Sequence, residues 1–153
     1  MTDTPIAYTA DGRPVFDNTP TVVSVLVRDG HRLITVERNN EPGRGLLGLP
    51  GGYHMRGETW QQAGARELWE ETGYILDPDF LRLVSMETDE YGNNLVICEA
   101  MVEPDKDPGH ELPDEVKSVM LLSEPGPFEG RWAFPRHHMA ADRYMPALMD
   151  ETA

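Results

Sequence analysis

The sequence predicts a mixed α/β fold, in which a sheet of several strands packs with one helix from the middle of the chain and one from its end. Apolar and β-branched runs of strand length recur along the chain between Gly, Pro and Asn turn signals. Capping signals at Thr59 and Gly73 bracket a helix between these runs. The length of 153 residues suits one hydrophobic core, so we expect a single α/β sandwich.

The chain before this helix is predicted to hold an arm and three strands. Residues 1–20 are polar and repeatedly broken by proline, which predicts an N-terminal arm or a short strand around Pro14–Phe16. Asp29-Gly30 is a hairpin-turn signal. Strands are predicted on both sides of this turn and again before a Pro-Gly-Gly break, at 21–27, 33–38 and 46–50.

The helix and the remaining elements follow in order. Thr59 and Gln62 match a capping box and Gly73 follows the last turn, so the helix is predicted at 59–72. Three strands and a last helix, interrupted by Pro146, are predicted at 81–88, 94–102, 116–122 and 136–149. An acidic, proline-rich loop covers 103–114. Without a long linker, we expect the arm, 1–20, to be followed by one domain, 21–153.

Composition excludes several kinds of partner. The formal net charge of −14 repels nucleic-acid polymers and anionic membranes, so we expect neither as a partner. No apolar run approaches the roughly 20 residues that a membrane span needs, and no basic-then-apolar leader opens the sequence. Cys98 is the only cysteine, which excludes an intrachain disulfide. These features predict a cytoplasmic protein.

The predicted helix at 59–72 carries an acidic cluster. Glu67, Glu70 and Glu71 have i, i+3 and i+4 spacing, which places three carboxylates on one face beside a single base, Arg66. Clustered oxygen ligands of this kind are what Mg²⁺ or Mn²⁺ requires. The alternative is an ordinary solvated acidic face. Gly51 and Gly52 precede the helix and permit close backbone approach, so a carbonyl there is a further candidate metal ligand.

The segment around this helix resembles the Nudix box, the signature of the Nudix hydrolases. The family pattern is G-x5-E-x7-R-E-U-x-E-E-x-G-U, where U is a bulky aliphatic residue. Tyr74, an aromatic residue, stands at the last aliphatic position. The other specified positions all match, at Gly52, Glu58, Arg66, Glu67, Leu68, Glu70, Glu71 and Gly73.

The resemblance implies a fold and a reaction. The fold is a Nudix-type α/β/α sandwich with a mixed sheet and a loop–helix–loop catalytic motif. Its catalytic and metal-binding groups correspond to Glu67, Glu70, Glu71 and the Gly51 carbonyl, with Mg²⁺ or Mn²⁺ as the cofactor. Arg66 corresponds to an arginine that orients a carboxylate, and Glu58 to a glutamate that holds the loop. The reaction is attack of water on a diphosphate linked to another group.

The residue that takes the proton from water varies across the family. It is either a glutamate of the box or one on a later loop. Here Glu115 is favoured as a catalytic and metal-binding residue, because EVKSVML resembles the family segment in which a loop glutamate leads into a strand. Glu111 is the second candidate. The alternative is that both are ordinary loop acids.

Weaker resemblances concern the substrate. The stretches FDNTPTVVSVLV, GLLGLPGGY and RWAFPRHHMAADRYM resemble a subgroup that hydrolyses ADP-ribose and FAD-like dinucleotides, without the cysteines of the zinc ribbon that some members carry. Arg38 and, more weakly, Arg44 are candidate phosphate contacts. Aromatic candidates for stacking on adenosine are Tyr53, Tyr91, Trp132 and Phe134. The pair His137-His138 is expected to be polar surface.

The leading hypothesis is therefore metal-dependent hydrolysis of a nucleoside diphosphate linked to another group, such as ADP-ribose, FAD or an NADH-like molecule, with release of a nucleoside monophosphate. A nucleoside triphosphate pyrophosphohydrolase would use the same chemistry. A non-catalytic nucleotide sensor is the third alternative, although all box carboxylates are present. The substrate is a small nucleotide in each case, and a homodimer is possible because many relatives form one.

Overall fold

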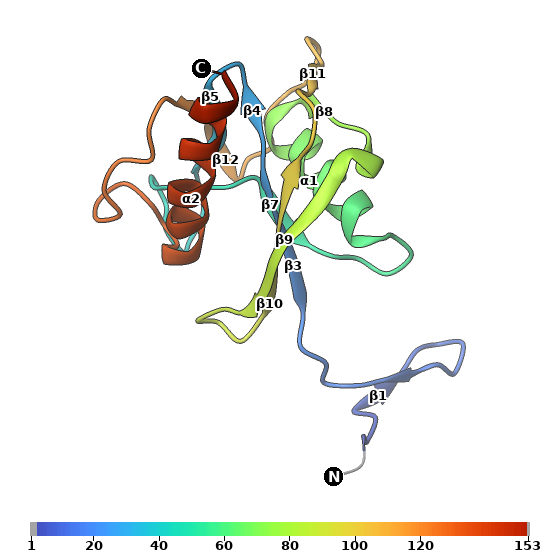
Figure 1. Ribbon diagram of the computed structural model, residues 1–153. Coiled ribbons are helices and arrows are strands. Elements are labelled where there is room, and N and C mark those ends of the chain that lie inside the picture. The colour runs from blue at the N-terminus through green and yellow to red at the C-terminus, as the bar shows by residue number, and fades with distance from the viewer. Residues whose placement is uncertain (1–2, 153) are drawn as a thin grey trace.

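The computed structural model describes residues 3–152, with side chains described up to residue 146 (Figure 1). It is a mixed α/β structure with one long helix in the middle of the chain and one at its end, as predicted, and its longer strands form two sheets rather than one. The strands are β1 (Ala7–Tyr8), β2 (Pro14–Val15), β3 (Thr21–Leu26), β4 (Arg28–Asp29), β5 (Arg32–Arg38), β6 (Leu47–Gly48), β7 (Gly51–Tyr53), β8 (Tyr74–Ile75), β9 (Leu81–Thr88), β10 (Asn94–Ala100), β11 (Asp105–Lys106) and β12 (Val116–Leu122). The helices are α1 (Trp60–Thr72), the short 3₁₀ helix η1 (Pro78–Phe80) and α2 (Pro135–Thr152).

The two larger sheets differ in strand direction, because one is mixed and the other is entirely antiparallel. One has the order β7-β3-β10-β9, in which β3 and β10 are parallel and the other neighbours are antiparallel. The second has the order β12-β5-β4, with β6 added to β5. The turn between β4 and β5 contains Gly30 with φ of 63°, as the Asp29-Gly30 signal predicts. Strand β10 ends at Ala100, two residues before the predicted end at 102.

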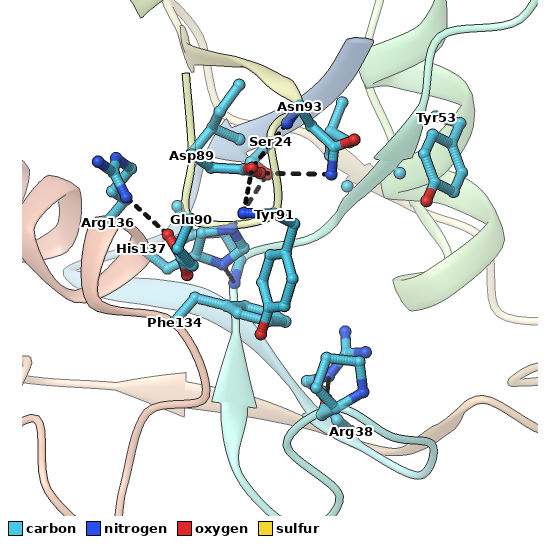
Figure 2. A pocket seen from close by; sticks show the side chains of 16 residues that line it. Ser24, Arg38, Tyr53, Asp89, Glu90, Tyr91, Asn93, Phe134, Arg136 and His137 are labelled. Atoms are coloured by element: carbon cyan, nitrogen blue, oxygen red, sulfur yellow. Dashed lines mark hydrogen bonds and ion pairs between the residues drawn. The ribbon is translucent and has the colours of Figure 1, made fainter. Parts of the chain in front are cut away.

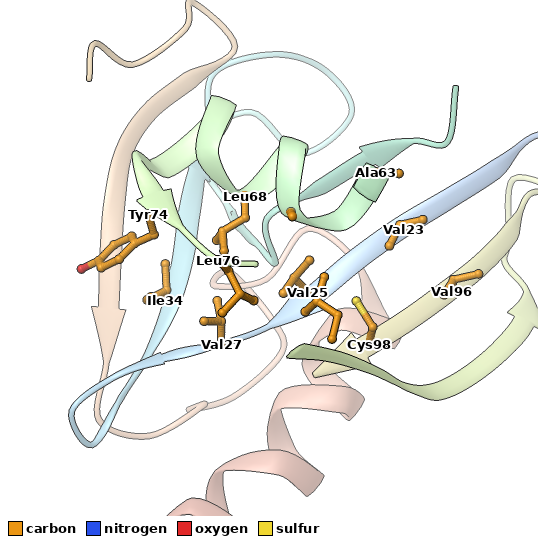
Figure 3. Close-up of a cluster of buried hydrophobic side chains, with 12 residues drawn as sticks. Val23, Val25, Val27, Ile34, Ala63, Leu68, Tyr74, Leu76, Val96 and Cys98 are labelled. Carbon is orange, nitrogen blue, oxygen red and sulfur yellow. The ribbon is translucent and has the colours of Figure 1, made fainter. Parts of the chain in front are cut away.

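Helix α1 covers one face of the sheets (Figure 3). Alternate residues of β3 and β10 point to this face because successive side chains of a strand lie on opposite sides. Val23, Val25, Val96 and Cys98 are buried there against Leu68 of α1. Burial of a side chain such as Leu68 contributes roughly 2 kcal/mol, so this contact fixes α1, and with it the acidic cluster, on the sheet.

Helix α2 covers the opposite face. The other set of alternate residues, including Leu26, Leu95 and Ile97, packs there with Ala141 and Met145 of the helix. The prediction that Pro146 interrupts this helix is wrong, because α2 runs on to Thr152. The proline lacks an N–H for the carbonyl of Asp142 one turn earlier, but Asp142 is exposed and water can bind that carbonyl.

The strand predicted at 46–50 is shorter in the structure, where β6 covers only Leu47–Gly48, and the chain then crosses to the other sheet. After β6 it forms β7, which pairs antiparallel with β3 through Val23↔Gly52 and Ser24↔Gly51. This pairing requires glycine, since a Cβ on Gly51 would lie 2.3 Å from the carbonyl oxygen of Val23. The Pro-Gly-Gly break therefore separates two strands, and its glycines permit the close backbone approach of β7 to β3.

The arm at 1–20 contains a two-stranded hairpin of β1 and β2 that projects from the α/β body (Figure 1). The short strand predicted around Pro14–Phe16 corresponds to β2. Ile6 and Tyr8 are exposed there. None of the helices in the described part of the chain is long and apolar enough to cross a membrane.

Candidate active site

Helix α1 is capped at both ends. Thr59 Oγ1 accepts from the backbone N–H of Gln62 at 3.1 Å, and Gln62 Oε1 accepts from that of Thr59 at 2.9 Å. This is the predicted capping box, and Gly73 ends the helix with φ of 79°. The caps define the register of α1, so the residues that project from its acidic face are fixed relative to the preceding loop.

Arg66 lies at the centre of the acidic cluster. Its guanidinium donates to both carboxylate oxygens of Glu58, at 2.9 and 2.7 Å, and to Glu67 at 2.9 Å. It also contacts Glu70 at 3.3 Å and the Tyr53 carbonyl at 3.0 Å. The hydrogen bonds from Arg66 lower the pKa of Glu58 to about 2. The arginine thus ties the loop before α1 to the helix and offsets part of the charge of the cluster.

Glu67 and Glu71 point towards the glycine backbone of β7. Glu71 accepts a hydrogen bond from the Gly51 N–H at 2.6 Å, and a Cβ on Gly52 would lie 2.5 Å from the Glu67 carboxylate. Burial raises the pKa of Glu71 to about 8, against the lowering effect of the Gly51 N–H. Burial also raises the pKa of Glu67, opposed by Arg66. At both carboxyl groups the effect of burial is larger than that of the hydrogen bonds, so added positive charge would favour their ionised forms.

The carboxylates of Glu67, Glu70 and Glu71 are suitable ligands for a hard divalent cation, although each of them now binds another group of the protein. Among the residues with described side chains, no three His, Cys, Asp or Glu are gathered closely enough to hold a metal ion. The reason is visible in the contacts, because Arg66 binds Glu67 and Glu70 while Gly51 binds Glu71. Carboxylate oxygens with raised pKa values on one helical face nevertheless fit Mg²⁺ or Mn²⁺, which supply the missing charge.

The loop before β12 lies beside this helix. Glu111 and Glu115 line a cavity of about 450 Å³ together with Trp69, Glu70 and His110. Burial is the main cause of the raised pKa of Glu71, and the charge of Glu115 adds to it. The backbone of the loop is held by Asn39, which donates to the carbonyls of Glu115 and Asp114 at 2.9 and 2.8 Å. The structure thus brings both loop candidates to the acidic face.

His110 and Trp69 hold this loop to α1, and the sequence did not single them out. His110 Nε2 lies 3.0 Å from the carbonyl oxygen of Glu70, and the indole N–H of Trp69 donates to Asp107 at 3.1 Å. The His110 side chain also packs on Gly73, because a Cβ added to Gly73 would lie only 2.9 Å from the Cβ of His110. A lone histidine in an acidic loop gives no sequence signal for such a contact, because its partner is a backbone carbonyl.

A second cavity, of about 390 Å³, is lined in part by Gly51 and Gly52 of β7 (Figure 2). Its wall contains Arg38 and Tyr53, two of the predicted substrate contacts. Arg38 Nε donates to the Pro42 carbonyl at 2.7 Å, and burial lowers the pKa of its guanidinium. Among the residues with described side chains, no carboxylate forms an ion pair with Arg38, so its outer nitrogens are available to an anion.

Arg44 and the aromatic candidates are placed differently. Arg44 is exposed and lies 3.8 Å from Glu41 and 3.4 Å from Asn39, outside the residues that line this cavity. Tyr91 and Phe134 line the cavity as Tyr53 does. Trp132 is wrong as a stacking candidate, because it is 2% exposed in the core and its indole N–H donates to the Pro125 carbonyl.

The expectation that His137-His138 is polar surface is wrong for His137, which is buried beside the cavity. Its Nδ1 accepts from the Leu49 N–H at 3.0 Å, so a neutral ring carries its proton on Nε2, which faces Ser24 Oγ at 3.3 Å. Burial lowers the pKa of His137 to about 3. His138 is half-buried, with Nε2 2.9 Å from the Gly126 carbonyl oxygen.

We expect His137 to make the protein less stable in acid. Because its pKa falls from 6.5 to about 3 on folding, the stabilisation is complete above pH 6.5 and is lost as pH falls towards 3. In that window, one extra proton on the unfolded chain lowers the free energy of unfolding by about 1.4 kcal/mol per pH unit. Urea unfolding at several pH values between 7 and 4 should show a shallower slope for His137→Asn than for the wild type.

The matched control is His31→Asn, which removes an exposed histidine. Carboxyl groups titrate alike in all three proteins, so their contribution cancels from the comparison. A His137→Asn slope equal to that of the His31→Asn protein would contradict a neutral buried His137.

The chain is similar in sequence to a known protein family and to several characterised proteins. The family model for the NUDIX domain matches residues 18–138. The ADP-ribose pyrophosphatase of Methanocaldococcus jannaschii is 38% identical over 53 residues, which are 35% of this chain and 31% of that protein. Phosphatase NudJ of Escherichia coli K12 is 41% identical over 64 residues, 41% of this chain and 40% of that protein. The matched segments thus span well under half of either relative.

Solved structures show the same fold. A NUDIX hydrolase from Nitrosomonas europaea has a TM-score of 0.68 at 20% identity, over 91% of this chain and 77% of that one. The NUDIX domain of Shewanella oneidensis NrtR, in complex with ADP ribose, has a TM-score of 0.66 at 21% identity, over 87% and 90%. The family model covers most of the chain, including the whole of α1 and every residue that lines either cavity, so the chain belongs to the Nudix hydrolase family.

Proposed function

We propose that the protein hydrolyses the pyrophosphate bond of a nucleoside diphosphate linked to another group and releases a nucleoside monophosphate. The observation that supports this most is that the same two glycines border both the acidic face of α1 and the 390 Å³ cavity. Gly51 donates its N–H to the Glu71 carboxylate, Gly52 lies against the carboxylate of Glu67, and both glycines line the cavity that contains Arg38. A diphosphate in that cavity would therefore lie between an arginine and the acidic face.

The acidic face would hold the cation that such a substrate needs. Glu67, Glu70 and Glu71 would provide carboxylate oxygens, with the Gly51 carbonyl and Glu115 as further ligands. When bound, Mg²⁺ or Mn²⁺ offsets the charge of the diphosphate and lowers the pKa of a coordinated water. Arg66 would then keep Glu58 and the loop in place as the carboxylates turn from it.

Side chains of the protein would bind the diphosphate and accept the proton from water. Arg38 would bind a phosphate oxygen and orient the diphosphate, since its guanidinium has no carboxylate partner among the described side chains. The Glu115 carboxylate would accept a proton from the attacking water, because it is an exposed base that lines the same cavity as Glu70. Glu111 is the second candidate for that role.

The relatives support a dinucleotide-like substrate. One is an ADP-ribose pyrophosphatase, and one solved structure is a complex with ADP ribose. We therefore place ADP-ribose, FAD and NADH-like molecules first. A cavity of about 390 Å³ lies near the lower end of the usual range for small-molecule sites, which suits one nucleotide half of such a substrate.

The test is product analysis of the purified protein with Mg²⁺ and then Mn²⁺. The panel holds ADP-ribose, FAD, NADH, nucleotide sugars and the common and oxidised nucleoside triphosphates. We expect AMP from ADP-ribose or FAD and no product in EDTA. Pyrophosphate released from one triphosphate would instead identify a triphosphate pyrophosphohydrolase. No product from the whole panel, together with tight metal-dependent binding of one compound, would favour the sensor.

A further inference from the structure

The 390 Å³ cavity has an aromatic end. Tyr91 is 57% exposed at the tip of the hairpin between β9 and β10, and its ring meets Phe134 edge to face with centroids 6.2 Å apart. The Arg38 guanidinium lies over the Phe134 ring at 4.8 Å, and His137 meets its edge at 4.8 Å. Figure 2 shows these groups together, with Tyr53 on the other side of the cavity. Phe134 is thus already in contact on several sides, whereas Tyr91 keeps exposed ring surface.

The hairpin that carries Tyr91 is held in one conformation. The Asp89 side chain accepts from the backbone N–H groups of Tyr91 and Asn93, both at 2.9 Å. Gly92 takes φ of 82°, which the tight turn requires and which other residues adopt at a cost. An exposed aromatic ring on an ordered turn loses little conformational entropy when a flat ligand covers it.

The hairpin is also tied to α2 across the cavity. Arg136, in the first turn of α2, donates to Glu90 at 2.6 Å and lies 3.5 Å from Glu87. A cation near a helix N-terminus is unfavourable on its own, and the two glutamates offset that charge. These ion pairs fix the distance between the tip of the hairpin and the start of α2, where Phe134 is located.

We propose that Tyr91 is a specificity-determining residue that stacks on the nucleobase of the bound nucleotide, with Phe134 behind it. The ligand is a nucleotide on the strength of the proposed function, and the inference adds which end of the cavity takes its planar ring. Arg38 contacts Phe134 and lines the same cavity as Tyr91. A nucleotide whose base stacks on Tyr91 would therefore have its phosphate in the part of the cavity that contains Arg38. Tyr53 has no ring partner among the described residues, and Trp132 is buried.

The test is calorimetric binding of two probes that differ only by the base, AMP and ribose 5-phosphate, to the intact protein in Mg²⁺. We expect Tyr91→Ala to weaken AMP binding by about ten-fold, the usual effect of removing one stacked aromatic ring. Tyr91→Phe, which keeps the ring, should stay within about two-fold of the wild type. Ribose 5-phosphate should bind all three proteins alike, because it contains nothing to stack.

The control is Tyr8→Ala, which removes an exposed tyrosine from the N-terminal hairpin, away from the residues that line the cavity. Unchanged AMP affinity in Tyr91→Ala would overturn the inference, as would an equal loss for ribose 5-phosphate, which would indicate a deformed hairpin. A loss in Tyr91→Phe as large as in Tyr91→Ala would assign the effect to the hydroxyl and overturn it too. Ring-dependent AMP binding by a protein that hydrolyses none of the panel would overturn the proposed function and support this inference.

Discussion

Replacing Glu71 by glutamine should lower kcat at saturating Mg²⁺ by at least about 100-fold while leaving the fold intact, and Glu70→Gln should act in the same direction. The amide Oε1 can still accept the hydrogen bond that Glu71 receives from the Gly51 N–H. It cannot supply the negative charge that a divalent cation requires. The measurement is the initial rate with the best substrate of the panel, over a range of Mg²⁺ concentrations.

Stability in EDTA separates this effect from misfolding. The pKa of Glu71 is raised to about 8, so without metal the carboxyl group is mostly protonated at pH 7 and resembles the amide that replaces it. Glu71→Gln should therefore unfold in urea at the same concentration as the wild type, or at a higher one. Glu129→Gln, which changes an exposed glutamate far along the chain, is the control for charge alone. Full activity of Glu71→Gln at saturating Mg²⁺ would remove the basis of the proposed function.

The local features of the acidic helix could be predicted from the sequence. Thr59, Gln62 and Gly73 act on neighbours within one turn, so their spacing alone locates both ends of α1. The spacing of Glu67, Glu70 and Glu71 likewise places them on one helical face. The mixed α/β class follows from alternating apolar strands, whose two sets of side chains form the two clusters under α1 and α2.

Long-range contacts could not be predicted in this way. His137 is buried because Leu49 and Ser24, from distant parts of the chain, supply its hydrogen-bond partners. Nothing in the adjacent residues distinguishes it from the half-buried His138. The meeting of Arg136 with Glu90 depends on how α2 packs on the sheet, as does the position of Phe134 beside Tyr91. Local patterns specify elements, whereas these contacts arise from the packing of elements on each other.

The two glycines of β7 should respond to alanine in different ways, although they are adjacent. A Cβ on Gly51 would lie 2.3 Å from the Val23 carbonyl oxygen and 2.8 Å from Ser24 Cα, and both are backbone atoms of the neighbouring strand. Relief would require β7 to move away from β3, so Gly51→Ala should lower the free energy of unfolding by about 3 kcal/mol or more. Urea denaturation followed by circular dichroism measures this loss.

A Cβ on Gly52 would instead meet the carboxyl group of Glu67 at 2.5 Å, the far end of a flexible side chain. Glu67 can rotate away, so Gly52→Ala should cost only about 1 kcal/mol of stability. Because a misplacement of about 1 Å can cost roughly 100-fold in rate, its kcat should still fall by at least ten-fold.

The control for both substitutions is Gly48→Ala, whose new Cβ would have only ordinary contacts, the nearest at 3.6 Å from His137 Nδ1. It should therefore change both stability and kcat little. Equal loss of stability in Gly51→Ala and Gly52→Ala would mean that the strand, not the Glu67 carboxylate, limits the space at Gly52. A stable but inactive Gly52→Ala protein would place Glu67 in the reaction through its position alone, because the substitution leaves every carboxylate of the acidic face in the chain.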